Sequence, residues 1–390
     1  MGKQLSPATR DAPGQFPYLR VANVHLGRID YADVNTMGFT SAERETYGLK
    51  PGDILLNEGQ SLDLVGRSAI YDGAEGKFCF QNTLIRFRPG ADVLPAYAQV
   101  VFERWLATGV FAAIAKQTTS IAHLGGDRFG ALLFPLIPVA AQRRIVEVLA
   151  SFTELERSVE ASITKLRNVR QGALLASMES VVSGKPTAGW VHVPLKDIVP
   201  SAEYGISEAL DRDARGVPVL RMNNIQNARI DANDLRYCPV PVPSKLFLRR
   251  GDVLFNRTNS MEHIGKAAMW RDELPSATFA SYLVRLVPDL RRVTPEYLVE
   301  WLMHPLVRQR VRSISTVAVQ QVNVNPSRLG ELEIDLPVDL AEQRRIVATL
   351  EACDEQIGRE EEELNKLREL KQGLVDDLLS GRVKASALAA

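Results

Sequence analysis

The stretch Gln142-Arg-Arg-Ile-Val-Glu-Val-Leu149 decides the fold, because a near copy, Gln343-Arg-Arg-Ile-Val-Ala-Thr-Leu350, follows 201 residues later. Each copy opens a run of apolar residues at alternating steps of three and four, which is typical of an amphipathic helix. The runs predict two helices within residues 139–185 and 338–384. Each apolar pattern lasts about 40 residues, which is roughly 60 Å of helix. Helices of that length extend beyond one small domain.

The apolar positions form a seam along each predicted helix. In the first helix the seam is Ile145, Leu149, Phe152, Leu155, Val159, Ile163, Leu166 and Val169. In the second helix it is Ile346, Leu350, Cys353, Ile357, Leu364, Leu367, Leu374 and Leu378. Packing the two seams against each other buries both within one chain and predicts an antiparallel intramolecular coiled coil. Dimerisation through the same seams, or burial of each seam on the edge of a globular core, are the alternatives.

The residues that precede each helix are also repeated, which predicts two similar α/β domains over residues 1–138 and 190–337. Residues 17–30 and 218–231 share seven identities in fourteen positions. The segments between matched stretches differ, so that Gln60-Ser-Leu-Asp-Leu64 stands opposite Asn259-Ser-Met-Glu-His263. A common framework with different loops indicates two related functions with different targets. The predicted class is α+β, with two α/β domains separated by two long helices.

Composition narrows the functional classes. A chain of 390 residues exceeds one typical hydrophobic core. The 47 basic residues balance 47 acidic ones, so cations that bind DNA must gather on one face or come from a partner. The cysteines and histidines show no spacing typical of a metal site or disulfide framework. No apolar run suits a membrane span and nothing resembles a signal peptide, so we expect a cytoplasmic protein.

Motifs for catalysis are absent from the sequence. It contains no phosphate-binding P-loop and no Asn/Asp-Pro-Pro-Tyr/Phe stretch of a base methyltransferase. Pro51-Gly-Asp53 followed by Glu58 has the acidic pair of a nuclease but lacks the lysine, and the aligned copy has Arg257 in place of Glu58. A turn glycine beside a solvent-exposed aspartate explains this stretch better. We expect no catalytic residue, no metal site and no bound cofactor.

The order of these parts resembles that of a known family. An α/β domain followed by a helix with Pro…Gln-Arg-Arg-Ile occurs twice, and Leu370-Lys-Gln-Gly-Leu-Val-Asp-Asp-Leu-Leu-Ser-Gly381 is similar to the family's usual ending. The chain resembles, over nearly its whole length, the specificity subunit of type I restriction–modification systems. The resemblance implies that each α/β domain is a target recognition domain reading one half of a bipartite, asymmetric DNA site. It also implies that the helices fix the unread spacer.

The resemblance assigns catalysis to partner subunits. Two modification subunits would bring S-adenosylmethionine and N6-adenine methylation, and restriction subunits would bring translocation and cleavage with ATP and magnesium. Docking of the modification subunits is expected at the repeated helix starts, on Gln142, Arg143, Arg144, Gln343, Arg344 and Arg345. A non-catalytic, duplicated coiled-coil scaffold without DNA specificity is the alternative function.

One departure from the family pattern concerns the first domain. The second domain opens with Trp190-Val-His-Val-Pro-Leu-Lys-Asp-Ile-Val199, which has no counterpart because Gly2 aligns near Gly205. We therefore expect the first domain to lack about its first fifteen residues. Either the first residue of the chain is assigned too far downstream, or the first domain forms this part of its fold from other residues.

Side chains that read base edges are usually Arg, Lys, Asn or Gln, because they form paired hydrogen bonds with guanine or adenine. Candidates in the first domain are Arg20, Asn23, Asn57, Gln60, Gln81 and Asn82. Candidates in the second domain are Arg221, Asn224, Asn256, Arg257, Asn259, Gln320 and Gln321. Three of these positions are shared by both domains, namely Arg20/Arg221, Asn23/Asn224 and Asn57/Asn256. We expect these side chains to stabilise loops or to contact phosphates rather than to read different bases. The better candidates for sequence reading are the unshared Gln60, Arg257, Asn259, Gln320 and Gln321.

Overall fold

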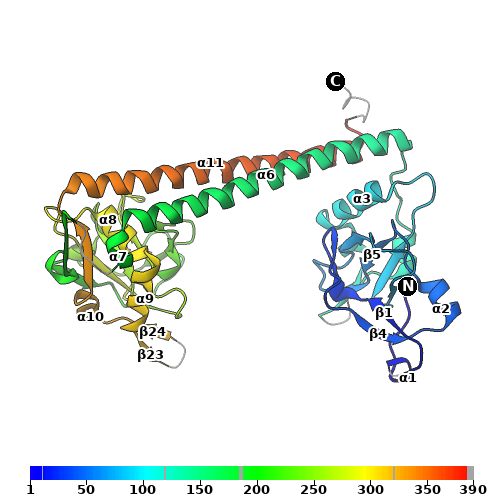
Figure 1. The fold of residues 1–390 in the computed structure, drawn as a ribbon, viewed down its shortest axis with the longest axis horizontal. Coiled ribbons are helices and arrows are strands. Elements are labelled where there is room, and N and C mark those ends of the chain that lie inside the picture. The colour runs from blue at the N-terminus through cyan, green and yellow to red at the C-terminus, as the bar shows by residue number, and fades with distance from the viewer. Residues whose placement is uncertain (11, 118–119, 184–187, 319–320, 384–390) are drawn as a thin grey trace. The chain divides into compact units, whose positions relative to one another are not determined.

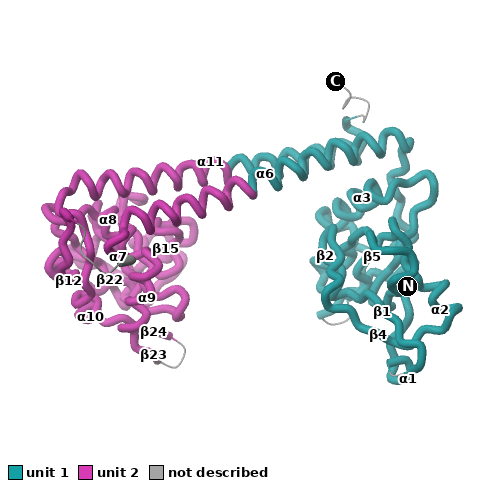
Figure 2. The backbone as a smooth tube through the Cα atoms, in the orientation of Figure 1, with its two compact units in different colours: residues 1–160, 362–390 teal, residues 161–361 magenta. Residues whose placement is uncertain are grey.

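The structure is a computed structural model that describes all residues except 11, 118–119, 184–187, 319–320 and 384–390 (Figure 1). Its contacts divide the chain into two compact units (Figure 2). Unit 1 comprises residues 1–160 and 362–390, and unit 2 comprises residues 161–361. Each unit combines one α/β domain with part of both long helices.

Short strands form the framework of unit 1. They are β1 (Gln15–Leu19), β2 (Val24–His25), β3 (Arg28–Ile29), β4 (Asn35–Gly38), β5 (Ile54–Asn57), β6 (Gly59–Gln60), β7 (Ser68–Ile70), β8 (Cys79–Phe80), β9 (Leu84–Phe87), β10 (Lys116–Gln117) and β11 (Ala122–His123). The central strand β5 pairs antiparallel with β7 and β9, while β1 pairs antiparallel with β4 and parallel with β8. A third sheet has the order β10-β11-β6, and β2 pairs with β3.

Helices cover the core of unit 1. They are α1 (Pro7–Arg10), η1 (Val21–Asn23), α2 (Ser41–Tyr47), α3 (Pro95–Ala107), α4 (Val110–Ile114) and α5 (Gly126–Gly130). The apolar face of α3 contributes Tyr97 and Val101 to one buried cluster with Ile54 and Leu56 of β5. Burial of this face fixes α3 on the central sheet, because apolar burial is the main stabilising contribution to such packing.

Unit 2 repeats this framework. Its strands are β12 (Trp190–Pro194), β13 (Ser201–Tyr204), β14 (Val217–Leu220), β15 (Ile225–Gln226), β16 (Arg229–Ile230), β17 (Arg236–Cys238), β18 (Val253–Asn256), β19 (Thr258–Asn259), β20 (Ala267–Met269), β21 (Thr278–Phe279), β22 (Leu283–Val287), β23 (Thr316–Ala318), β24 (Gln321–Asn323) and β25 (Glu333–Pro337). Its shorter helices are α7 (Glu179–Ser183), η2 (Leu195–Asp197), η3 (Met222–Asn224), η4 (Ser244–Leu246), α8 (Pro295–Met303), α9 (Pro305–Ser313) and α10 (Pro326–Gly330).

Each strand pairing of unit 1 has a counterpart in unit 2. Strand β18 pairs with β20 and β22 as β5 pairs with β7 and β9. Strand β14 pairs antiparallel with β17 and parallel with β21, and the sheet β19-β24-β23 matches β6-β11-β10. The prediction of two similar α/β domains is confirmed.

One edge differs between the units. In unit 2, β12 pairs along its whole length with β25, and β13 adds a fourth strand beside β22. Residues 132–137 occupy the position of β25 in unit 1, and among the described residues they form no strand. The side chains of Leu133 and Leu136 in this segment are 94% and 63% exposed. The two copies are therefore alike in their centre and unlike at this edge.

The turn before each central strand corrects one expectation from the sequence. Gly52 and its counterpart in unit 2 have φ angles of +91° and +92°, a region that favours glycine. The aspartate that follows, however, is buried, since Asp53 is 1% and Asp252 6% exposed. Asp53 pairs with Arg88 at 2.6 Å and Asp252 with Arg285 at 3.3 Å. The prediction of a solvent-exposed aspartate is wrong, because an arginine far along the chain compensates the buried charge.

Helices α6 (Val139–Ser177) and α11 (Leu340–Leu379) pack against each other in opposite directions. In unit 1, Leu149 near the start of α6 belongs to the same buried cluster as Leu378 at the end of α11. In unit 2, Leu174 near the end of α6 shares a cluster with Leu350 near the start of α11. The predicted antiparallel coiled coil within one chain is confirmed.

Two residues of the predicted seam face solvent instead. The side chains of Leu155 and Val169 are 54% and 51% exposed. Their neighbours take the inward positions: Glu156 binds Lys371 at 3.0 Å in unit 1, and Arg170 binds α11 in unit 2. The prediction was wrong at Leu155 and Val169. At both places the next residue, Glu156 or Arg170, faces α11 and forms polar contacts there, so the apolar side chain turns toward solvent.

Candidate nucleic-acid interface

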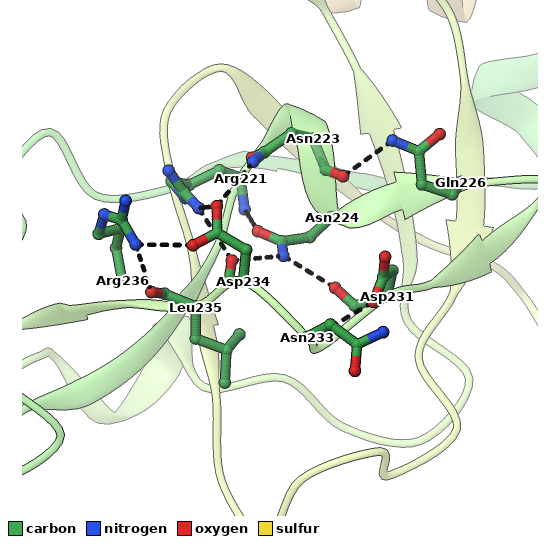
Figure 3. Close-up of polar contacts among 9 residues, drawn as sticks. All are labelled: Arg221, Asn223, Asn224, Gln226, Asp231, Asn233, Asp234, Leu235 and Arg236. Atoms are coloured by element: carbon green, nitrogen blue, oxygen red, sulfur yellow. Dashed lines mark hydrogen bonds and ion pairs between the residues drawn. The ribbon is translucent and has the colours of Figure 1, made fainter. Parts of the chain in front are cut away.

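A turn that follows β14 holds two of the candidate residues of unit 2 (Figure 3). The Arg221 guanidinium donates through Nη2 to the Asp234 carboxylate and to its carbonyl oxygen, both at 2.9 Å. Asn224 is 2% exposed and donates through Nδ2 to the carbonyl oxygens of Asp231 at 2.8 Å and Asp234 at 3.0 Å. The hydrogen bond from Arg221 lowers the pKa of the Asp234 carboxyl below its usual range. Both side chains therefore tie down the loop before β17.

The equivalent turn of unit 1 has the same bonds. Arg20 Nη2 lies 2.8 Å from Asp33 Oδ2, and Asn23, 1% exposed, donates to the carbonyl oxygens of Asp30 at 3.0 Å and Asp33 at 2.7 Å. Identical bonds in both units indicate that this turn is part of the shared framework.

The asparagines that end the two central strands are also internal. Asn57 and Asn256 are fully buried at 0% exposure. Asn57 Nδ2 donates to the carbonyl oxygen of Val24 at a long 3.4 Å. Burial keeps both side chains from any surface ligand, so they and the two buried asparagines of the turns stay outside the reading set proposed below.

A cavity of about 840 Å³ brings other candidates of unit 2 together. Arg257, which directly follows β18, lines it together with Gln321 and Asn323 of β24. Figure 1 shows β23 and β24 at the end of unit 2 away from α11. Gln321 is exposed, whereas the candidate Gln320 lies outside the described residues. Residues far apart in the sequence thus share one surface hollow.

Arg257 has a distinct electrostatic environment in this cavity. Its guanidinium lies 5.0 Å from the centre of the Tyr204 ring, a cation–π distance. Its Nη1 donates to the carbonyl oxygen of Ser281 at 3.4 Å. No carboxylate among the described residues forms an ion pair with it. Tyr204 and Tyr282 are 49% and 46% exposed, and Tyr282 lines the cavity together with Glu208. The cavity therefore presents a cation that is stacked on one tyrosine ring and has no ion-pair partner among the described residues.

The remaining unshared candidates lie on the rims of the two small hairpin sheets. Asn259 Oδ1 accepts from the Ser260 amide at 2.8 Å. Gln60 Oε1 accepts from the Ser61 amide at 3.2 Å in the corresponding position of unit 1. Both side chains are partly exposed.

Two further candidates of unit 1 occupy the turn between β8 and β9. Gln81 Oε1 accepts a hydrogen bond from the Thr83 hydroxyl at 3.4 Å, and Asn82 is partly exposed. Their counterparts in unit 2 are Ala280 and Ser281, which line the cavity. The turn therefore presents different side chains on the same backbone.

Unit 1 replaces the cation with an acid at the position of Arg257. Glu58 follows β5, and its Oε2 lies 3.0 Å from Nδ1 of His123 on β11. From the sequence, Glu58 was expected only as a poor nuclease carboxylate, and His123, Tyr204, Tyr282 and Asn323 were not among the predicted DNA-binding residues. The one available signal was the reversal of charge between Glu58 and Arg257 at aligned positions.

The repeated helix starts divide into a buried and an exposed part. Gln142 and Gln343 are 0% exposed. Gln142 Oε1 accepts from the Leu94 amide at 2.8 Å, and Nε2 donates to the carbonyl oxygens of Asp92 and Ile137 at 2.7 and 2.8 Å. Gln343 makes the same three bonds in unit 2, at 2.9, 2.9 and 2.8 Å. Each glutamine thus clamps its domain to its helix.

The arginines beside these glutamines face solvent. Arg143 and Arg144 are exposed on α6, and Arg344 and Arg345 are exposed on α11.

Among the described residues, no three His, Cys, Asp or Glu side chains are grouped so as to hold a metal ion. No helix in the described parts of the chain is both long and apolar enough to cross a bilayer.

Comparison with known proteins gives a consistent set of relatives. The family model described as the type I restriction modification DNA specificity domain matches residues 187–369. The chain is 30% identical over 200 residues to MjaX, a specificity subunit assigned to a type I restriction enzyme of Methanocaldococcus jannaschii, across 50% of this chain and 47% of that one. It is 22% identical over 311 residues to the EcoBI type I specificity subunit of Escherichia coli, across 71% and 64%. The chain spans less than two thirds of both relatives.

A solved structure shares the fold. A chain from a study of complex assembly and conformational transition of the type I R-M system superposes with a TM-score of 0.62 at 18% identity. The match covers 94% of the present chain and 91% of the other. Two α/β domains with two long helices are therefore the common architecture.

Proposed function

Because this chain belongs to the family of type I restriction–modification specificity subunits, we propose that it selects the DNA sequence for a complex of methyltransferase and endonuclease subunits. The α/β domain of each unit reads one half of a bipartite, asymmetric site in double-stranded DNA. The chain itself is non-catalytic. S-adenosylmethionine, ATP and magnesium belong to the modification and restriction subunits.

The observation that carries this proposal is the pairing of a constant framework with variable surface residues. Both units repeat the arginine–asparagine turn and the central strand. On that framework unit 1 presents Glu58 and Asn82, whereas unit 2 presents Arg257 and Ser281 at the same positions. Such a pattern fits two readers of different sequences, because base contacts specify a site while the rest of the interface positions the protein.

The two long helices suit the roles of spacer and docking surface. Helix α6 and helix α11 each contribute residues to both units. Their starts expose equivalent arginine pairs, Arg143–Arg144 and Arg344–Arg345. Two equivalent surfaces on one chain fit two copies of one modification subunit. The buried glutamines beside them contribute indirectly, by holding each domain on its helix.

Co-expression with a type I modification subunit from the same genome tests the proposal. We expect a complex with two modification subunits per chain, whose DNA affinity falls steeply with rising salt. Sequencing of methylated adenines should show a bipartite motif that disappears when this gene is deleted. A scaffold without specificity would leave methylation independent of the gene, and that result would reject the proposal.

The spacer role has its own test. Insertion of four residues into both α6 and α11 lengthens each helix by about 6 Å. Because neighbouring base pairs are about 3.4 Å apart, the unread spacer should grow by about two base pairs while both half-sites stay the same. An unchanged spacer in the methylated motif would show that the helices do not set it.

A further inference from the structure

The residue that follows the central strand has the same backbone bonds in both units. In unit 1, the Glu58 amide donates to the carbonyl oxygen of Thr83 at 2.9 Å, and its carbonyl oxygen accepts from Leu124 at 2.8 Å. In unit 2, Arg257 bonds in the same way to Tyr282 at 3.1 Å and to Val324 at 2.8 Å. The backbone is thus equivalent at this position, and only the side chain differs.

The side chain of Arg257 is prepared for a planar ligand edge. The Tyr204 ring centre lies 5.0 Å from the guanidinium and limits the positions open to it, and Arg257 lines the cavity of about 840 Å³. A fixed guanidinium can donate two parallel hydrogen bonds to O6 and N7 of guanine. A phosphate contact needs only a positive charge, which an unstacked lysine would supply equally well.

The side chain of Glu58 has the opposite chemistry. An ionised carboxylate only accepts hydrogen bonds, and among the bases it suits the N4 amino group of cytosine. Its Oε2 is engaged by His123 at 3.0 Å, and no described residue bonds to Oε1. A carboxylate also repels phosphates, so a backbone contact is unfavourable here.

We infer that the residue directly after the central strand is a sequence-reading position in both units, with Arg257 selecting a guanine and Glu58 selecting a cytosine. His123 and Tyr204 are positioning residues, because each orients the reading side chain from a neighbouring strand. The assignment depends on the two domains reading DNA as proposed above. It adds which base each domain requires at one matched position.

Methylation of a randomised duplex library by the purified complex tests this inference. With the wild-type chain, the half-site read by unit 2 should contain a required guanine. Arg257→Gln should relax or change that base, with loss of about tenfold or more in preference, while the other half-site is unchanged. Glu58→Gln should alter one base of the half-site read by unit 1 only. Arg229→Gln, an exposed arginine of unit 2 outside the cavity, is the matched control.

Arg257→Lys separates base reading from phosphate contact. Lysine keeps the charge but lacks the two parallel donors, so the guanine preference should fall as in Arg257→Gln. If Arg257→Lys behaves as the wild type, or Arg257→Gln weakens methylation of all sequences equally, the inference is overturned. An unchanged motif in both the Arg257 and the Glu58 variants overturns it as well. If the wild-type complex shows no bipartite motif, the proposed function itself fails, which is a separate outcome.

Discussion

Unit 1 and unit 2 place the same domain against the same pair of helices, but the contact between domain and helices differs. In unit 1, α3, α6 and α11 leave an open groove of about 610 Å³, lined largely by apolar side chains. Val100 and Ala150 lie on its walls, and Lys371 binds Thr153 and Glu156 at 2.9 and 3.0 Å. The domain of unit 1 thus rests on its helices through apolar contacts and one ion pair, between Arg104 and Asp376 at 2.7 Å.

In unit 2 the equivalent positions carry charges. Glu300, Glu351 and Asp354 replace Val100, Ala150 and Thr153, and the remaining cavity is about 20 Å³. Arg170 donates to Glu300 at 2.8 Å and to Asp354 at 2.9 Å. Burial raises the pKa of Glu300, and the positive charge of Arg170 opposes that shift. Two copies of one fold therefore use different chemistry at the same junction and should respond differently to the same kind of mutation.

The largest expected effect comes from removing the central cation of unit 2. Arg170→Ala leaves two carboxylates with little exposure and no partner, and should destabilise unit 2 by about 3 kcal/mol. Lys371→Ala, the equivalent change in unit 1, should cost about 1 kcal/mol, because it leaves only one carboxylate, that of Glu156, without its partner in a groove that is open to solvent. Hydrogen exchange of the full chain, resolved by peptide, measures each unit separately. Equal losses in both units would contradict the difference in chemistry.

A compensated variant sharpens the same comparison. The triple change Arg170→Met, Glu300→Val and Asp354→Thr gives unit 2 the type of junction found in unit 1. Well-packed apolar replacement of a buried ion cluster is often neutral or stabilising, so protection of unit 2 should return to near the wild-type level. Continued loss of protection would show that the ion cluster is required for reasons other than charge balance.

The two glutamine clamps should behave alike, in contrast to the ion cluster. Gln142→Ala and Gln343→Ala each remove three side-chain hydrogen bonds to buried backbone groups, at a cost of about 2 kcal/mol. Peptide-resolved hydrogen exchange should show faster exchange at the start of α3 or α8. Arg143→Ala and Arg344→Ala, which change exposed neighbours, are the controls and should have little effect. A much larger loss in one unit than in the other would show that the clamps are not equivalent.

The smallest expected effect is the pH dependence of the edge that unit 2 alone possesses. His192 of β12 lies 2.7 Å from Asp335 and 2.6 Å from Glu333, and the bond to Asp335 chiefly raises its pKa above 6.5. The stabilisation of unit 2 by protonated His192 is therefore complete below pH 6.5, and it is lost as the pH rises through the raised pKa of this side chain. Peptide-resolved hydrogen exchange of the full chain at a series of pH values should show β12 and β25 losing up to about 1 kcal/mol of protection on that rise. His192→Gln should abolish the dependence, and an unchanged dependence would exclude His192 as its cause.

The large features of the fold could be predicted from the sequence, because periodicity and repetition report on them directly. The two helices, their antiparallel pairing and the duplicated domains all follow from patterns within continuous stretches. The side-chain partners could not be predicted in this way. The pairing of Asp53 with Arg88, or of Arg170 with Glu300, joins residues from separate elements, and no spacing within one stretch indicates such contacts. The same holds for the cavity that unites Arg257 with Gln321.

The most direct test of the account exchanges one domain and reads the resulting DNA specificity. Residues 190–337 are replaced with the second domain of another family member, and the modified chain is co-expressed with its modification subunit. Sequencing of methylated adenines should then show one half-site changed, with the other half-site and the spacer retained. Changes in both half-sites, or in neither, would contradict the central claim that each domain reads its own half on a shared framework.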